Sequence, residues 1–292
     1  MFYLLCGTTL ISFSAVLVKL TSIGPTMTGF YCMLVGGMVL ALWGTVHRQF
    51  HFRQTSVLWV ALLAGLFLAL DLVFWHRSIH YVGPGLATIL INFQVVFLTL
   101  FVMVALREPL TWTRGISIPV SLMGLLLLCG VDWHTFDVSY RTGIVFGLLA
   151  AILYAVHLLL LRTSQTCAGA LSPAANMALV SLATAGLLGP IGWVQGESFV
   201  IQGRWDYGIV LAYGVLSQVV AWPLIAKGLL QLEASRAGLI LLLQPALAFV
   251  WGLLFFHRST SAGELIGVVL AMGAIYLGSL SRSPSTLASD TH

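Results

Sequence analysis

Apolar segments of about 20 residues follow one another along almost the whole chain, and this repetition constrains the fold more than any other feature. A helix needs roughly 20 mostly apolar residues to cross the hydrocarbon core of a bilayer. About ten such segments occur, near residues 2–20, 26–46, 57–79, 84–106, 111–130, 142–162, 172–193, 207–229, 234–256 and 260–280. The sequence therefore predicts an all-α polytopic membrane protein with about ten transmembrane helices and no separate soluble domain.

Composition supports the same fold class. Hydrophobic residues make up 59% of the chain and charged residues only 8%, whereas a soluble domain carries about 25% charged residues. The four cysteines lie far apart and form no CxxC pair, so we expect no disulfide framework, no metal site and no cofactor. The apolar N-terminus has no preceding basic residue, so we interpret it as the first span and not as a secretory signal.

The placement of charges predicts an orientation. The 13 lysines and arginines are scattered singly, which favours an orientation signal over a nucleic-acid partner. With the N-terminus inside, more of the basic loop residues fall on the inner side, and the acidic loop residues fall on the outer side. We predict a multi-pass protein of the inner (plasma) membrane with both termini in the cytoplasm and a disordered polar tail over residues 281–292.

The chain also repeats itself at a spacing of about 150 residues. Ala87 then matches Ala237, and Gln94 matches Gln244. Two five-helix repeats, over residues 1–131 and 142–280, are the simplest account. An odd number of spans makes the second repeat enter the membrane from the opposite side, and such inverted repeats are typical of carriers that work by alternating access.

Short motifs recur in order along both halves. They are Gly85-Leu86-Ala87-Thr88 and Glu108-Pro109-Leu110-Thr111 in the first half, and Ala234-Ser235-Arg236-Ala237 and Gln244-Pro245 in the second. On these motifs the chain resembles the EamA family of the drug/metabolite transporter superfamily over nearly its whole length. The resemblance implies a ten-helix carrier that moves small metabolites, often outward, but names no substrate. The halves differ in two places, since Val95 stands opposite Pro245 and Arg258 stands opposite Glu108.

Asp71 is the sharpest exception to the apolar pattern. It is the only acidic residue that we place well inside a span, and an ionisable group there costs about 2.5–3.5 kcal/mol on insertion scales. We interpret it as a partner for a substrate ammonium or as a proton-coupling carboxylate, with helix packing as the alternative. Trp75 lies one turn further on the same face, and His76 faces that side less directly.

Other polar and aromatic residues lie inside the spans and are candidates for substrate binding. Amides can bind a polar substrate or join helices, and aromatic rings can stack on a substrate or fill a core. The complete predicted substrate-binding set is Asp71, Trp75, His76, Asn92, Gln94, Tyr154, His157, Gln218, Trp222 and Gln244.

We therefore predict a secondary transporter for a small polar metabolite such as an amino acid, an amine or an amino-acid derivative, and the family resemblance implies that it is an exporter. The chain has no P-loop, so direct ATP drive is not expected, and we expect no catalytic residue. Protons are a candidate coupling ion and a homodimer is a candidate assembly. The alternatives are a membrane enzyme acting on a lipid-linked substrate and a scaffold or sensor that does not transport.

Overall fold

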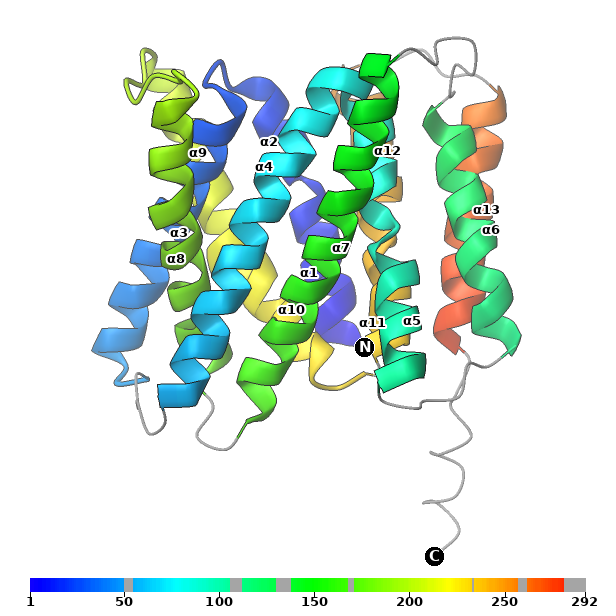
Figure 1. Cartoon of the computed structure of the whole chain (residues 1–292), viewed down its shortest axis with the longest axis horizontal. Helices are drawn as coiled ribbons and strands as arrows, with labels where there is room; N and C mark the ends of the chain where they lie inside the picture. Colours follow the sequence, from blue (N-terminus) through cyan, green and yellow to red (C-terminus); the bar gives the residue numbers. More distant parts are fainter. Residues whose placement is uncertain are drawn as a thin grey trace, which may run out of the picture.

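The computed structural model describes residues 1–49, 55–105, 112–129, 138–167, 171–232, 234–256 and 262–280. All regular elements in these ranges are helices, and Figure 1 shows them running up and down in one bundle. They are α1 (Phe2–Ser12), α2 (Ser14–Leu20), α3 (Pro25–Val46), α4 (Thr55–Asn92), α5 (Gln94–Ala105), α6 (Trp112–Cys129), α7 (Val138–Thr166), α8 (Pro173–Val194), α9 (Arg204–Tyr213), the π-helix η1 (Gly214–Ala221), α10 (Trp222–Leu229), α11 (Ala234–Leu241), α12 (Leu243–Phe256) and α13 (Ala262–Leu280). The predicted tail over residues 281–292 lies outside the described residues.

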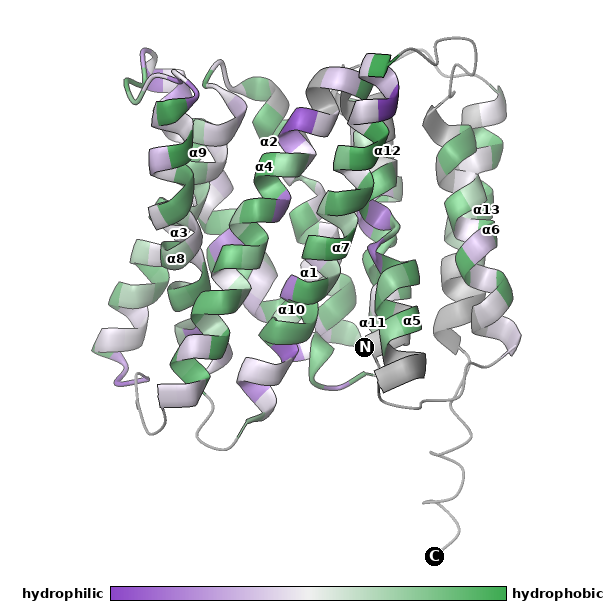
Figure 2. Ribbon diagram, viewed as in Figure 1, coloured by the Kyte–Doolittle hydropathy of each residue, from purple (hydrophilic) through white to green (hydrophobic). Residues whose placement is uncertain are grey.

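The predicted membrane fold is confirmed. Helices α1 and α2 together form one crossing, as do α9, η1 and α10, and as do α11 and α12. The long α4 with α5 supplies two crossings, and α3, α6, α7, α8 and α13 supply one each, which gives about ten in the described part of the chain. In Figure 2 the hydrophobic residues dominate between the two ends of the bundle. Large apolar side chains such as Trp112 and Val269 are exposed on its outside, as expected for a surface that faces lipid.

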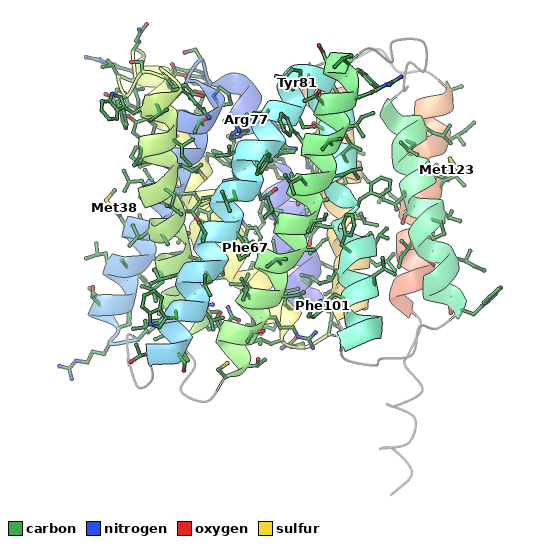
Figure 3. All side chains as sticks on the ribbon, viewed as in Figure 1. Met38, Phe67, Arg77, Tyr81, Phe101 and Met123 are labelled. Atoms are coloured by element: carbon green, nitrogen blue, oxygen red, sulfur yellow. The ribbon has the colours of Figure 1, made fainter. Side chains whose placement is uncertain are left out.

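The residues of α4 cover two predicted spans, because the chain doubles back within this element. Residues Thr55–Asn92 are all helical, yet the direction of the chain reverses. A straight helix would separate Ser78 from Leu90 by about 18 Å, but both lie within 3 Å of where a Cβ on Gly147 of α7 would stand. Figure 3 shows the same fold-over, with Tyr81 at the upper end of the bundle and Phe101 of α5 near its lower end. The chain therefore turns back between the two predicted spans, near residues 57–79 and 84–106.

Three of the spans are interrupted by a single residue near their middle, and two of these interruptions form a pair. Phe13 separates α1 from α2, Phe93 separates α4 from α5, and Leu242 separates α11 from α12. Phe93 and Leu242 each donate the N–H three residues back, to Leu90 and Leu239 respectively, at 3.1 Å, which tightens the helix locally. These two positions are 149 residues apart, so they fall at equivalent places in the predicted repeats. The break at Phe93 needs no proline, since Val95 stands where the second half has Pro245.

Glycines allow the helices to approach closely. A Cβ on Gly143 of α7 would stand 2.5 Å from the Cβ of Tyr81, and one on Gly124 of α6 would stand 2.6 Å from the Gly267 carbonyl oxygen of α13. Real Cβ atoms do not approach this closely, so the contacts require glycine. The Gly143/Gly147 pair therefore packs α7 against α4 within one chain, the use expected of such spacings.

Candidate functional site

Asp71 lies on the face of α4 that packs against α7. Two α4 residues seven positions to either side of it make hydrogen bonds to α7. The Ala64 carbonyl oxygen lies 2.8 Å from His157 Nδ1, and Ser78 Oγ donates to the Gly143 carbonyl at 2.8 Å. Because seven residues are two helical turns, Asp71 shares their face. Its side chain is only 2% exposed. Its Oδ1 atom is buried and has no hydrogen-bond partner among the described residues.

Three aromatic side chains surround this part of the interface. Tyr154 of α7 is close enough to Asp71 for the two to interact electrostatically. Its ring stacks on His157, with ring centroids 5.9 Å apart and planes 8° apart. Trp222, the first residue of α10, meets both rings edge to face, at 6.3 Å from Tyr154 and 5.5 Å from His157. We call Asp71, Tyr154, His157 and Trp222 the central cluster.

The central cluster joins residues from three distant parts of the sequence. Helix α4 supplies the carboxylate, α7 supplies Tyr154 and His157 one turn apart, and Trp222 follows the π-helix η1. No lysine or arginine whose side chain the structure describes is buried, so none of these supplies an internal cation beside the Asp71 carboxylate. A lone carboxylate among aromatic faces is chemically suited to a cation, because both the charge and the ring quadrupoles attract positive charge.

Trp75 and His76 continue from Asp71 along α4. Their Nε1 and Nδ1 atoms are buried, and neither atom has a hydrogen-bond partner in the described structure. The two rings lie 5.3 Å apart. His76 is directed toward α3, where its Cε1 atom lies 3.7 Å from where a Cβ on Gly29 would stand. Trp75 is therefore next to the central cluster along the helix, whereas His76 points toward a different neighbour.

Gln218 occupies a packing position between α3, α8 and η1. Its Oε1 atom accepts a hydrogen bond from Ser181 Oγ at 3.2 Å, and its amide nitrogen lies 3.9 Å from the sulfur of Cys32. A Cβ on Gly36 would stand 2.1 Å from the Cβ of Gln218. The structure thus places Gln218 away from the rings of the central cluster, although Trp222 lies only one turn further along the chain.

Asn92, Gln94 and Gln244 lie at the two paired helix interruptions. Asn92 and Gln94 flank Phe93 and are 6% and 3% exposed, and Gln244 follows Leu242 closely and is partly buried. Val95 packs with Leu239 and Leu242 in one apolar cluster, so the two interruptions meet. The Oε1 atom of Gln94 has no hydrogen-bond partner among the described residues. These amides form a second polar group, at the crossing of the two interrupted helices.

Two contacts were not anticipated from the sequence. Trp251 of α12 stacks on Phe13 at 4.3 Å and donates to Ser12 Oγ at 2.7 Å, where α1 gives way to α2. At one end of the bundle, Asp206 accepts hydrogen bonds from Thr21 and Ser22 between α2 and α3, and Glu197 accepts them from the N–H groups of Thr26 and Met27 in the first turn of α3. The sequence shows Glu197 and Asp206 as acidic residues near apolar spans, but it does not indicate which distant segment each one contacts.

Comparisons with known proteins agree with this architecture. The EamA-like transporter family matches residues 1–130 and again residues 141–280. The uncharacterized transporter YwfM of Bacillus subtilis is 26% identical over 270 residues, which cover 90% of this chain and 87% of that protein. The threonine/homoserine exporter RhtA of Salmonella typhimurium is 31% identical over 205 residues, which cover 68% of this chain and 64% of RhtA.

The fold is also known from experiment. A solved crystal structure aligns with 96% of this chain and 96% of its own, with a TM-score of 0.81 and 19% sequence identity. At that identity the likeness shows the shared fold. With the family matching both halves of a multi-pass helical bundle, this chain belongs to the EamA-like transporter family.

Proposed function

We propose that this protein is a secondary carrier that exports a small amino compound, such as an amino acid, an amine or an amino-acid derivative, across the bacterial inner membrane. The observation that carries the proposal is Asp71. It is a carboxylate inside the bundle with an oxygen that no described residue satisfies, and it interacts electrostatically with Tyr154. An unsatisfied buried acceptor costs about 1–3 kcal/mol, and more when it is charged. A substrate ammonium would supply the missing partner.

The similarity to RhtA supports the same chemistry. That relative is named as an exporter of threonine and homoserine, both of which carry an ammonium group. We propose that the ammonium binds at Asp71 with the rings of Tyr154 and Trp222 beside it. The repeats over residues 1–131 and 142–280 would then move relative to each other, so that the site opens to one side of the membrane at a time.

A proton can replace the ammonium at the same carboxylate. If Asp71 holds a proton when the substrate has left, and releases it when the next substrate binds, outward transport of the amine is coupled to inward movement of a proton. A bilayer-embedded carboxylate is a usual component of such relays. We include this exchange in the proposal because it needs no further ionisable residue in the central cluster.

Counterflow in proteoliposomes tests the proposal. Vesicles that contain the full chain are loaded with an unlabelled amino acid or amine, and uptake of the labelled compound is followed over a panel that includes L-threonine and n-butylamine. We expect counterflow for at least one amino compound, and its loss in the Asp71→Asn variant. Absence of counterflow for every compound in the panel, or counterflow at the wild-type rate with Asp71→Asn, would contradict the proposal.

A further inference from the structure

Trp75 of α4 carries a buried hydrogen-bond donor that no described residue uses. Its Nε1 atom is buried and has no hydrogen-bond partner in the described structure. An indole nitrogen has a hydrogen and no acceptor capacity, so it can only donate. Asp71 Oδ1 is also buried without a partner, and an oxygen of an ionised carboxylate can only accept. The two atoms are therefore not hydrogen-bonded to each other, and this part of α4 leaves one donor and one acceptor unused.

The helix places these two residues next to each other. The chain is helical throughout this part of α4, and residues four positions apart lie on neighbouring turns of one face, with Cβ atoms about 5–6 Å apart. Long side chains on a helix lean toward its N-terminal end, so the indole of Trp75 leans toward the turn that carries Asp71. One small ligand that lies along this face can therefore contact both residues.

The contacts of neighbouring residues show that Trp75 faces the interior of the bundle. Asp71 faces α7, as the hydrogen bonds two turns before and after it show. At about 100° per residue, His76 lies about 140° around the helix from Asp71, and Trp75 lies about 40° around in the same sense. His76 is directed toward Gly29 of α3, so Trp75 faces the space between α7 and α3. Leu68, two turns before Trp75 and on the same side, is only 3% exposed, so this side of α4 faces the core.

The unused donor and acceptor match a ligand that carries an acceptor close to its ammonium. In an α-amino acid the carboxylate and the ammonium are bonded to the same carbon atom, so both can contact groups that lie one helical turn apart. No lysine or arginine whose side chain the structure describes is buried, so a neutral N–H group such as that of Trp75 is the kind of donor available to the carboxylate. A simple amine would leave Nε1 unpaired, and a site with buried polar groups discriminates against a ligand that leaves them unpaired.

We infer that Trp75 Nε1 donates to the substrate carboxylate while Asp71 accepts from the substrate ammonium, which makes Trp75 a specificity-determining residue that selects amino acids over simple amines. The inference rests on the proposed function, because it assumes that the substrate ammonium binds at Asp71. It narrows the substrate class to amino acids and those derivatives that keep an acceptor on the carbon atom that carries the amino group.

Pairs of amino acids and their decarboxylated amines test this selection. The probes are L-threonine with 1-amino-2-propanol and L-norvaline with n-butylamine, and the readout is the dissociation constant from thermal stabilisation of the full chain in detergent. We expect the amino acid of each pair to bind about tenfold or more tightly than its amine, the effect of one hydrogen bond to a charged group. Equal affinities within the pairs, or tighter binding of the amines, would overturn the inference.

The matched variants are Trp75→Phe and Trp59→Phe. The first removes the N–H group and keeps most of the aromatic surface, so we expect the preference for the amino acid to fall to within about threefold. The second removes a tryptophan from the same helix at a position that is 63% exposed, and the preference should stay at the wild-type value. An unchanged preference in Trp75→Phe would show that another donor, such as the Tyr154 hydroxyl, binds the carboxylate, and would overturn the role of Trp75.

Two further outcomes are decisive for Trp75. Equal weakening of the amino acid and the amine in Trp75→Phe would show a packing role and would also overturn the inference. Should Trp75→Phe not fold, Trp75→Met makes the same test, because its side chain also lacks a hydrogen-bond donor.

The outcomes separate the inference from the proposed function. Binding of both members of each pair with equal affinity would refute the inference and leave the proposed function intact. Failure of every probe to bind, together with absence of counterflow for the whole panel, would refute both.

Discussion

The carboxylate of Asp71 differs from those of Glu197 and Asp206, at the end of the bundle, in how its oxygens are hydrogen-bonded. Asp206 accepts hydrogen bonds from Thr21 Oγ1 at 2.9 Å, from Ser22 N at 3.0 Å and from Ser22 Oγ at 2.6 Å. Glu197 accepts from the N–H groups of Thr26 and Met27 at 3.3 and 2.9 Å, at the start of α3. We call these contacts the carboxylate clasp. It joins the α2–α3 connection to the α8–α9 region, whereas Asp71 Oδ1 has no partner among the described residues.

This contrast distinguishes two carboxylates with a structural role from Asp71, the carboxylate that we propose to bind substrate. The clasp is complete within the protein, since both oxygens of each carboxylate accept donors from the chain itself. The clasp fixes the connection between two helices. The negative charge of Glu197 also interacts favourably with the positive, N-terminal end of the α3 dipole. Asp71 lies in a more costly environment and is incomplete. No described residue supplies the missing partner of Asp71 Oδ1, which agrees with our proposal that this group binds and releases a substrate.

The largest effect that this comparison predicts is on transport by Asp71→Asn. The substitution removes the charge and keeps the shape, so we expect at least a hundredfold loss of counterflow, since a charged hydrogen bond and the ion attraction are lost together. Folding should be preserved, as judged by gel filtration and melting temperature in detergent. Asp206→Asn is the matched control and should transport near the wild-type rate per folded molecule. Equal losses in the two variants would erase the distinction between the two carboxylates.

The next effect is on stability, and it falls on the clasp. Asp206→Ala leaves the Thr21 and Ser22 donors without their acceptor, so the connection between α2 and α3 should loosen. We expect the melting temperature in detergent to fall by several degrees, and we expect Asp71→Ala to lower it less, because Asp71 Oδ1 loses no hydrogen bond. A larger fall for Asp71→Ala would show that Asp71 stabilises the bundle and would break the comparison.

Close helix packing around Gln218 gives a smaller effect on stability. A Cβ on Gly36 would stand 2.1 Å from the Cβ of Gln218 and 2.9 Å from the Gly214 carbonyl oxygen. Gly36→Ala should therefore destabilise the protein by about 1–3 kcal/mol, as overpacking does, and should be detected as a lower melting temperature. Gly186→Ala on the neighbouring α8 is the control, because nothing lies within 4 Å of its Cβ position. Similar melting temperatures for the two variants would contradict the packing described for α3 and η1.

The smallest effect is expected for Gln218→Met, which keeps the length of the side chain. The amide of Gln218 already has a partner in Ser181, so its loss should cost about 1 kcal/mol of stability and leave the counterflow rate within about threefold of wild type. A loss of transport as large as that of Asp71→Asn would place Gln218 in the substrate site and would show that partnered groups also bind substrate.

The sequence predicted the membrane fold well because hydrocarbon as a solvent leaves few options. Apolar length and short connections were enough to give about ten crossings. The fold-over of α4 falls between the two predicted spans, near residues 57–79 and 84–106, but the sequence did not indicate that residues 55–92 would all be helical, because Gly-Pro usually signals an interruption. The break at Phe93 has no proline and no glycine beside it, so it depends on the packing of Val95 against the second interrupted helix.

The sequence predicted which residues are candidates for the site, but it did not predict which of them lie together. Asp71 stands out in the sequence because a charge inside a span is costly, and Tyr154, His157 and Trp222 belong to the predicted substrate-binding set. Sequence spacing could not show that these four meet while Gln218 turns toward α3 and His76 toward Gly29. Helix rotation and tertiary packing decide those directions. The tautomer of His157 depends on the carbonyl of Ala64, 93 residues earlier in the chain, and no local pattern records that contact.

Ligand-induced thermal stabilisation of the purified full chain decides whether a substrate ammonium binds at Asp71. The panel consists of amino acids, amines, nucleosides and organic acids, measured on wild type, Asp71→Asn and Asp206→Asn. We expect compounds with an amino group to raise the melting temperature of wild type and of Asp206→Asn, and we expect no such rise for Asp71→Asn. If Asp71→Asn were stabilised by the same compounds to the same extent as wild type, the claim that Asp71 is completed by a substrate ammonium would be wrong.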